Sequence, residues 1–267
     1  MQKPQILLAN DDGIRSPGLW AAAGALARIG FVTVVAPREQ CSGMGRSLPN
    51  TSDGIIEEQR VQVNGQEWSV YAVGGSPAQA VLHGILEVMP APPDLVVSGI
   101  NYGENMGTGV TISGTVGAAM EAAAMGYPAL AVSLETDQEH HLSYSQAVDF
   151  SAAAHFTLEF ARQLLTKSFP PDVDLLNINV PSDATPQTEW RLTPLSKDRY
   201  YDPTPPERDS WAQPGAVGYR EAAHRGKEKP GTDIAVVHKE RLVSVTPLSL
   251  DLTSRDSFAE IERILRK

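Results

Sequence analysis

Residues 5–13 have the sequence QILLANDDG, in which an apolar run ends in a polar turn. An apolar run of this length without alternation is typical of a strand that is covered on both faces. Residues 31–36 and 94–98 are runs of the same kind. Between the first two runs, Ser16 and Pro17 predict the start of a helix, with Ser16 as its N-cap. The order strand, helix, strand indicates two parallel strands of one sheet.

The same alternation continues along the chain. The predicted elements are helices from Ser76, at 115–125 and at 143–168, and strands at 128–134 and 175–180. Alternation of this kind predicts an α/β fold with a doubly wound, mainly parallel sheet and helices on both faces. An antiparallel hairpin is expected within residues 55–73, because Asn64-Gly65 is a signal for a two-residue turn.

The character of the sequence changes near residue 190. Proline, glycine and charged residues dominate 196–231, and residues 234–237 and 242–245 are predicted to form a hairpin before a short terminal helix at 258–265. So long an excursion cannot easily bury itself against its own domain, so we expect it to serve assembly. The predicted division is a catalytic core at 1–190 and an extended arm, hairpin and terminal helix at 191–267.

Composition excludes several classes of protein. The chain has 267 residues, 42% of them hydrophobic, which is enough for a large core. A net charge of −10 without a Lys/Arg-rich run argues against binding to a nucleic-acid polymer. No apolar stretch reaches the length of about 20 residues needed to span a membrane, and no leader pattern is present, so we expect a cytoplasmic protein. The single cysteine, Cys41, excludes an intrachain disulfide framework.

Two adjacent carboxylates, Asp11 and Asp12, follow the first predicted strand. In an open α/β sheet, ligands bind beyond the carboxyl ends of the strands. The two side chains can converge only if the chain turns here, and Gly13 supplies that freedom. Paired Asp oxygens suit a hard divalent cation such as Mg²⁺ or Mn²⁺. The alternative is that Asp-Gly marks only a turn.

Two further loops are predicted at the same edge of the sheet. Residues 38–47 form a polar loop after the second strand, and residues 99–109 hold four glycines after the third. Glycines allow the backbone to approach a ligand closely. Residues 113–115 then open a helix, and a helix N-terminus with free N–H groups can bind an anion. The alternative is that Ser113 or Thr115 only caps the helix.

Taken together, these segments resemble the successive signatures of the survival protein SurE family. The resemblance spans nearly the whole chain in the family's order. It rests on residues 10–13, 36–37 with 42–43, 94–103 with 105, 113–119, 175–181, and 231–233 with 243–248.

The resemblance implies a Rossmann-like core and a phosphomonoesterase that hydrolyses nucleoside 5′- and 3′-monophosphates with one divalent metal ion per subunit, Mg²⁺ or Mn²⁺. It also implies a homodimer or homotetramer assembled through C-terminal elements. The implied metal ligands are Asp11, Asp12, Ser42 and Asn101. The implied phosphate-binding residues are Asn105, Ser113, Gly114 and Thr115. Asp11 and Asp12 are also the catalytic candidates, and the attacking group is either metal-activated water or the carboxylate of Asp11.

Other nucleotide enzymes fit less well. The sequence has no Gly-x-Gly-x-x-Gly after the first strand, no P-loop and no Gly-x-Ser-x-Gly. The histidines lack metal-binding spacing, and His140 and His141 are expected in a solvated loop. The remaining alternative is a non-catalytic nucleotide-binding or assembly protein that retains the fold.

Overall fold

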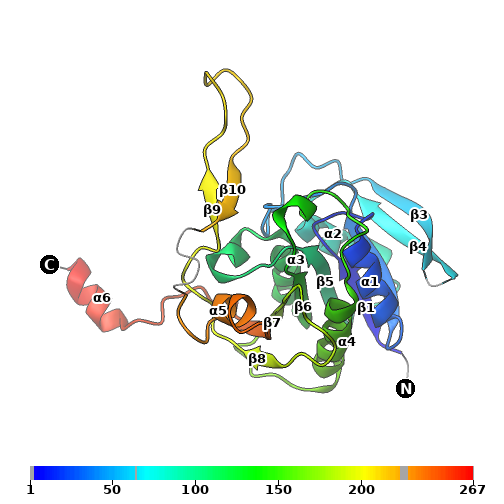
Figure 1. The fold of residues 1–267 in the computed structure, drawn as a ribbon. Coiled ribbons are helices and arrows are strands. Elements are labelled where there is room, and N and C mark those ends of the chain that lie inside the picture. Colours follow the sequence, from blue (N-terminus) through cyan, green and yellow to red (C-terminus); the bar gives the residue numbers. More distant parts are fainter. Residues whose placement is uncertain (1–2, 64, 223–227, 267) are drawn as a thin grey trace.

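The computed structural model describes residues 3–63, 65–222 and 228–266. Within them, nine strands form one mixed, mainly parallel sheet, and two more form a separate hairpin (Figure 1). The strands of the large sheet lie in the order β3 (Ile56–Val63), β4 (Gln66–Val73), β2 (Phe31–Pro37), β1 (Gln5–Ala9), β5 (Leu95–Tyr102), β6 (Ala129–Leu134), β7 (Leu175–Val180), β11 (Val243–Leu248) and β8 (Trp190–Leu192). Neighbours from β4 to β7 are parallel, whereas β3 is antiparallel to β4 and β11 is antiparallel to β7.

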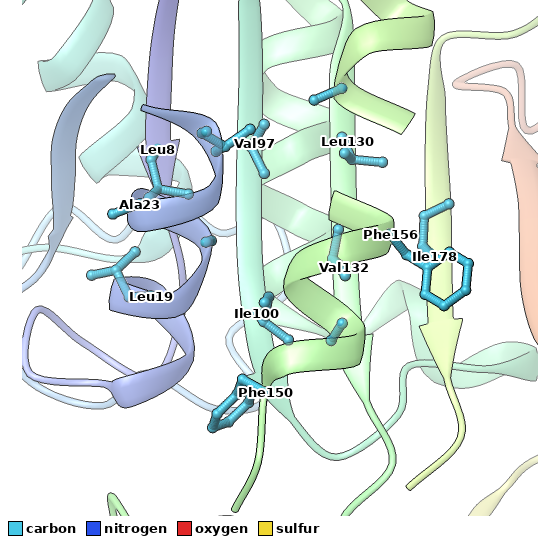
Figure 2. Close-up of a cluster of buried hydrophobic side chains, with 14 of the residues drawn as sticks. Leu8, Leu19, Ala23, Val97, Ile100, Leu130, Val132, Phe150, Phe156 and Ile178 are labelled. Carbon is cyan, nitrogen blue, oxygen red and sulfur yellow. The ribbon is translucent and has the colours of Figure 1, made fainter. Parts of the chain in front are cut away.

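Helices cover both faces of this sheet. The alternation of side chains along β1 separates two cores, because Ile6 and Leu8 face one layer while Leu7 and Ala9 face the other. The first layer contains α1 (Pro17–Leu26) and α4 (Ser151–Thr166), whose side chains meet the strands in Figure 2. The second layer contains α2 (Pro77–His83), which leads into a π-helical turn, and α3 (Gly114–Ala124). The predicted α/β class with helices on both faces is confirmed.

The predicted hairpin within residues 55–73 is also confirmed, since β3 and β4 pair antiparallel with Val63 opposite Gln66. Asn64 of its turn lies outside the described residues. No helix of the described chain is long and apolar enough to cross a membrane.

The prediction of a hairpin at 234–245 is wrong. Residues Asp233–His238 form helix α5, and β11 joins the large sheet beside β7. A short apolar run fits a buried helix as well as a strand, and here Asp233 starts a helix. Its carboxylate accepts from the backbone N–H groups of Ile234, Ser196 and Gly107, at 2.9, 2.8 and 2.8 Å.

The hairpin of the C-terminal region is formed instead by β9 (Tyr201–Thr204) and β10 (Gly218–Glu221), which pair antiparallel. We call residues 201–221 the arm. It projects away from the sheet, and the terminal helix α6 (Phe258–Leu265) lies on an extended connection at another side of the molecule (Figure 1).

Two predicted boundaries also change, and one predicted cap lacks its hydrogen bond. The helix expected at 143–168 begins only at Ser151, because Asp149 accepts from the Ser151 backbone N–H and Tyr144 has a φ of 47°. Strand β5 continues to Tyr102, pairing again with β6 after a register shift beyond Ser98, so the glycine loop starts later than expected. Ser16 stands at the N-cap of α1, but its side chain makes no capping hydrogen bond.

Candidate functional site

The turn after β1 is built by Asn10 and Gly13. The side-chain oxygen of Asn10 accepts from the Gly13 N–H at 3.2 Å, and its amide donates to the Gly13 carbonyl at 3.0 Å. Gly13 has a φ of 94°, and a Cβ there would lie 3.2 Å from the Glu39 carbonyl carbon. The turn expected from the sequence is therefore present. It places Asp11 and Asp12 just beyond the strand, where both residues are buried, with 4% of Asp11 and 1% of Asp12 exposed.

Asp11 lies against the start of α3. The Thr115 hydroxyl donates a short hydrogen bond to its Oδ1. A Cβ on Gly114 would lie 2.7 Å from the Asp11 Cβ and 2.9 Å from Oδ2, so only glycine allows this approach. The carboxylate thus sits at the positive end of a helix dipole, with Oδ2 beside a residue that has no side chain.

Asp12 is held by a different set of groups. Its Oδ2 accepts from the Tyr102 N–H at 3.2 Å, at the end of β5. The side-chain amide of Gln40 lies 3.3 Å from Asp12 Oδ1, 3.3 Å from Ser42 Oγ and 2.6 Å from the His141 carbonyl oxygen. Gln40 therefore joins Asp12 to Ser42, which is exposed. The sequence reasoning missed Gln40, although it lies in the polar loop after β2.

Asn101 lies at the same edge, on β5 beside Tyr102. Its side-chain amide donates to the carbonyl oxygens of Tyr102 and Gly103, at 3.0 and 2.6 Å. These two bonds fix the amide, and the side-chain oxygen accepts no hydrogen bond within the described residues. The four implied metal ligands thus lie at one edge of the sheet. Asp12 is linked to Ser42 through Gln40, and it is bonded directly to the Tyr102 N–H at the end of β5.

The electrostatics of the acidic pair fit a bound cation. Burial raises the pKa of Asp11, while bonds from the Thr115 hydroxyl and from backbone groups at the start of α3 oppose that rise. Burial and the charge of Asp11 raise the pKa of Asp12 well above its usual range. No cationic side chain of the described chain pairs with either carboxylate. Two uncompensated carboxylates with hydroxyl and amide oxygens nearby form a donor set of the kind that Mg²⁺ and Mn²⁺ prefer.

That donor set is mixed rather than acidic throughout. Over the described ranges, no group of three His, Cys, Asp or Glu side chains could hold a metal. A metal at this edge would therefore need the neutral oxygens of Ser42 and Asn101 in addition to the two carboxylates.

Asn105 lies in the glycine loop and is fixed by β6 and β7. Its side-chain amide donates to Ser133 Oγ at 2.9 Å, and its backbone N–H donates to Asn179 Oδ1 at 2.7 Å. The side-chain amides of Asn177 and Asn179 donate to its carbonyl oxygen, at 2.9 and 3.1 Å. The sequence reasoning missed these three partners, whose only signal is that they are polar residues inside apolar strands.

The predicted anion site at 113–115 has a more specific geometry. The Ser113 side chain accepts from the Val116 N–H at 3.1 Å and so caps α3, while Thr115 binds Asp11. The structure therefore brings 113–115 next to the acidic pair. No hydrogen bond of the described residues connects this helix start to Asn105.

The expectation of a solvated His141 is wrong. His141 is buried, its Nδ1 lies 3.0 Å from the Tyr219 hydroxyl, and its ring stacks on that of Tyr219 with centroids 6.0 Å apart. The reason is that the arm returns over this loop, where Gln138 also donates to the Tyr219 carbonyl oxygen at 2.8 Å. Burial lowers the pKa of His141, which favours the neutral ring.

Comparison with known proteins gives a consistent family assignment. Residues 6–202 match the family described as Survival protein SurE. The chain is 42% identical over 264 residues to a 5′-nucleotidase SurE of Thermococcus kodakarensis, covering 98% of both chains. It is 41% identical to a 5′-nucleotidase SurE of Methanocella arvoryzae, again covering 98% of both. A crystal structure of a SurE protein from Aquifex aeolicus superimposes with a TM-score of 0.75 at 32% identity, covering 98% of this chain and 100% of that one.

Proposed function

The chain belongs to the survival protein SurE family, and we propose from this premise that it is a 5′-nucleotidase that releases phosphate from nucleoside monophosphates. The observation that carries the proposal is the buried, uncompensated pair Asp11 and Asp12 at the carboxyl edge of the sheet. A folded chain keeps two such charges together at a considerable cost unless a ligand compensates them.

We further propose that one divalent ion, Mg²⁺ or Mn²⁺, binds to Asp11, Asp12, Ser42 and Asn101. Such an ion supplies Lewis-acid polarisation of a phosphate oxygen and neutralises charge. Gln40 aligns Asp12 with Ser42 through its shared amide, and Thr115 orients the carboxylate of Asp11. These contacts hold the oxygen atoms in place before substrate arrives, which favours transition-state stabilisation.

The phosphate would lie beside the acidic pair, near the start of α3. Gly114 lets this helix start approach Asp11 Oδ2 closely, and the N-terminal end of α3 favours an anion. We assign phosphate binding to Asn105, Ser113, Gly114 and Thr115, with Thr115 acting partly through Asp11. The attacking group is either metal-activated water or the carboxylate of Asp11.

Phosphate release tests the function directly. Purified protein is assayed with nucleoside 5′- and 3′-monophosphates, first as isolated, then with chelator, and then with Mg²⁺ or Mn²⁺ restored. We expect hydrolysis of the 5′-phosphates, loss with chelator and recovery with metal, and we also expect hydrolysis of the 3′-phosphates. Nucleotide binding without phosphate release under every condition would instead support the non-catalytic alternative.

The C-terminal region supports a second proposal, a homodimer or homotetramer. Trp211 at the tip of the arm is 94% exposed, and Phe258 and Leu265 on α6 are 64% and 79% exposed. Large apolar side chains on projecting elements are typical of protein contacts. Light scattering at micromolar concentration should give at least twice the monomer mass of 28.7 kDa, and a monomer would contradict the proposal.

A further inference from the structure

Glu104 occupies an unusual position beside the residues assigned to phosphate. It lies between Gly103 and Asn105 in the loop after β5, and only 5% of it is exposed. One carboxyl oxygen accepts a hydrogen bond from the Tyr201 hydroxyl at 2.5 Å, the other is buried without a hydrogen bond within the described residues, and the neighbouring Tyr200 side chain also interacts with the carboxyl group. Burial raises the pKa of Glu104 to about 7. A carboxyl group with so few partners is costly to bury, so its retention calls for a specific role.

Tyr201 belongs to the arm and is itself held firmly. Its ring packs edge-on against Tyr200 and Tyr219, with centroids 4.8 and 5.3 Å apart, and against His141 at 5.9 Å. Aromatic neighbours on several sides restrict rotation of the ring, so the direction of the hydroxyl is fixed by packing. The arm thus presents a rigid donor to the loop that carries Asn105.

The backbone of this loop is fixed on both sides of Glu104. Asn101 donates to the Gly103 carbonyl oxygen before it, and Asn105 is bonded to Asn179 after it. Between these points the side chain of Glu104 is the contact with the arm. Glu104 is joined to Asn105 by one peptide unit, so a change in the orientation of Glu104 acts directly on Asn105, whose side-chain amide donates to Ser133.

We propose that Tyr201 is a positioning residue for the phosphate-binding loop, and that it acts through Glu104 to keep Asn105 in its binding orientation. The inference rests on the proposed function of that site. It assigns a role in substrate binding to a residue of the arm. Both the neutral and the ionised carboxyl accept a hydrogen bond, so the contact persists through protonation of Glu104.

The test compares Tyr201→Phe with Tyr71→Phe. Tyr71 is a partly buried tyrosine on β4, distant along the sheet from the site, and its hydroxyl makes no hydrogen bond in the described chain. We expect Tyr201→Phe to raise KM for a nucleoside monophosphate and Kd for inorganic phosphate by about tenfold, the effect of one hydrogen bond. The kcat and the metal affinity from calorimetry should change less than about twofold in both variants.

Variants of Glu104 separate positioning from general stability. Glu104→Gln keeps an acceptor and should retain nearly normal phosphate affinity, whereas Glu104→Leu should reproduce the loss of Tyr201→Phe. The double variant Tyr201→Phe/Glu104→Leu should bind phosphate as tightly as either single variant, because both changes remove the same hydrogen bond. If Tyr201→Phe does not fold, the comparison of Glu104→Gln with Glu104→Leu provides the test.

Unchanged KM and phosphate affinity in Tyr201→Phe and Glu104→Leu, with only a lower melting temperature, would overturn the inference. A wild-type protein that releases no phosphate would refute the proposed function instead. In that case calorimetry with inorganic phosphate and Mg²⁺ still decides, since equal affinity of wild type and variants, or no binding by the wild type, also overturns the positioning role.

Discussion

The carboxyl end of β1 and the tip of the arm differ in the side chains that they bury and expose. At β1, the charged residues Asp11 and Asp12 are almost completely buried. On the arm, Trp211 near the tip is 94% exposed, and Val217, just before β10, is 67% exposed. Most carboxylates in folded proteins are exposed and large apolar side chains are more often covered, so each region departs from the usual distribution.

The comparison indicates where this chain depends on something outside itself. A buried carboxylate pair is costly until a cation compensates it, and exposed apolar groups are costly until a surface covers them. The first region is surrounded by hydrogen bonds that fix its geometry, whereas the second has few contacts. We therefore expect changes at β1 to affect chemistry and changes at the arm to affect assembly or, through Tyr201, substrate binding.

The largest effect is expected from Asp12→Asn. The amide keeps an acceptor for the Tyr102 N–H but removes a charge from the proposed metal shell. We predict that kcat/KM falls about 1000-fold or more, with weaker metal binding by calorimetry. The melting temperature of the chelated protein should not fall, because repulsion with Asp11 is relieved.

The matched control is Asp209→Asn, which removes the same charge from an exposed position on the arm. It should leave kcat/KM and metal affinity unchanged. Full activity of Asp12→Asn would mean that burial of the pair has no catalytic purpose, and the contrast between the two regions would then be one of stability alone.

Glu104, which contacts Tyr201 at the base of the arm, should make stability depend on pH. Its pKa in the folded chain is about 7, above the usual value of 4.5. Folding therefore favours the protonated form, so the contribution is fully present below pH 4.5 and is lost as the pH rises through 7. We predict a loss of up to about 3 kcal/mol over that range from this group.

Urea unfolding of chelated wild type and Glu104→Gln between pH 4.5 and 8 measures this contribution. The variant should lose less stability over the range. Asp11 and Asp12 have raised pKa values and add a decline of the same sign in both proteins. Parallel curves for the two proteins would show that Glu104 ionises as it does in the unfolded chain.

Much of the fold could be predicted because burial leaves a local signature. Strands β1 and β2 are mostly apolar without alternation, and α2 begins at Ser76 with a capping box, so pattern and structure agree. The run at 234–237 is wrongly predicted to be a strand, because four apolar residues fit a helix as well as a strand. The helix starts at Asp233, just before this run, and the Asp233 carboxylate is held by the backbone N–H groups of Ser196 and Gly107, which lie far away in the sequence.

The candidate site divides in the same way. Asp11 and Asp12 stand out because they directly follow a buried strand. The contacts that orient the site join residues far apart, such as Gln40 with His141, 101 positions away, and Glu104 with Tyr201, 97 positions away. No local pattern encodes such pairs, so they become visible only when the sheet and the arm are in place.

Thr115→Val tests whether the fixed geometry at β1 matters for chemistry. Valine has nearly the same shape but cannot donate to Asp11, so the carboxylate loses one partner and its orientation. We predict a fall in kcat/KM of about 10- to 100-fold, with metal binding weakened less. Steady-state kinetics beside calorimetry measure both quantities.

Thr157→Val is the control for that change. Thr157 is equally buried, on α4, and its hydroxyl donates to the Ala153 carbonyl oxygen at 2.7 Å. It should affect stability but not kinetics. If both variants kept full activity, the hydrogen bond from Thr115 would be structural, and Asp11 would need no fixed orientation.

The smallest effect is expected from Ser113→Ala, and it distinguishes a helix cap from a phosphate ligand. Ser113 accepts from the Val116 N–H, and its own hydroxyl proton goes to no acceptor within the described residues, so it can cap α3 and donate to a phosphate at once. Loss of the cap should cost about 1 kcal/mol of stability. Loss of a phosphate donor should lower kcat/KM by roughly tenfold.

Ser76→Ala provides the comparison, because Ser76 caps α2 in the same way, accepting from the Gln79 N–H at 3.2 Å, but donates to the Ser47 carbonyl oxygen. Thermal unfolding should show a loss in both variants, while kinetics on a nucleoside monophosphate should show one in Ser113→Ala alone. Equal kinetics in the two variants would remove Ser113 from the phosphate site and leave it as a cap. Phosphate binding would then depend on the backbone of α3 and on Asn105, which would increase the importance of the contact between Glu104 and the arm.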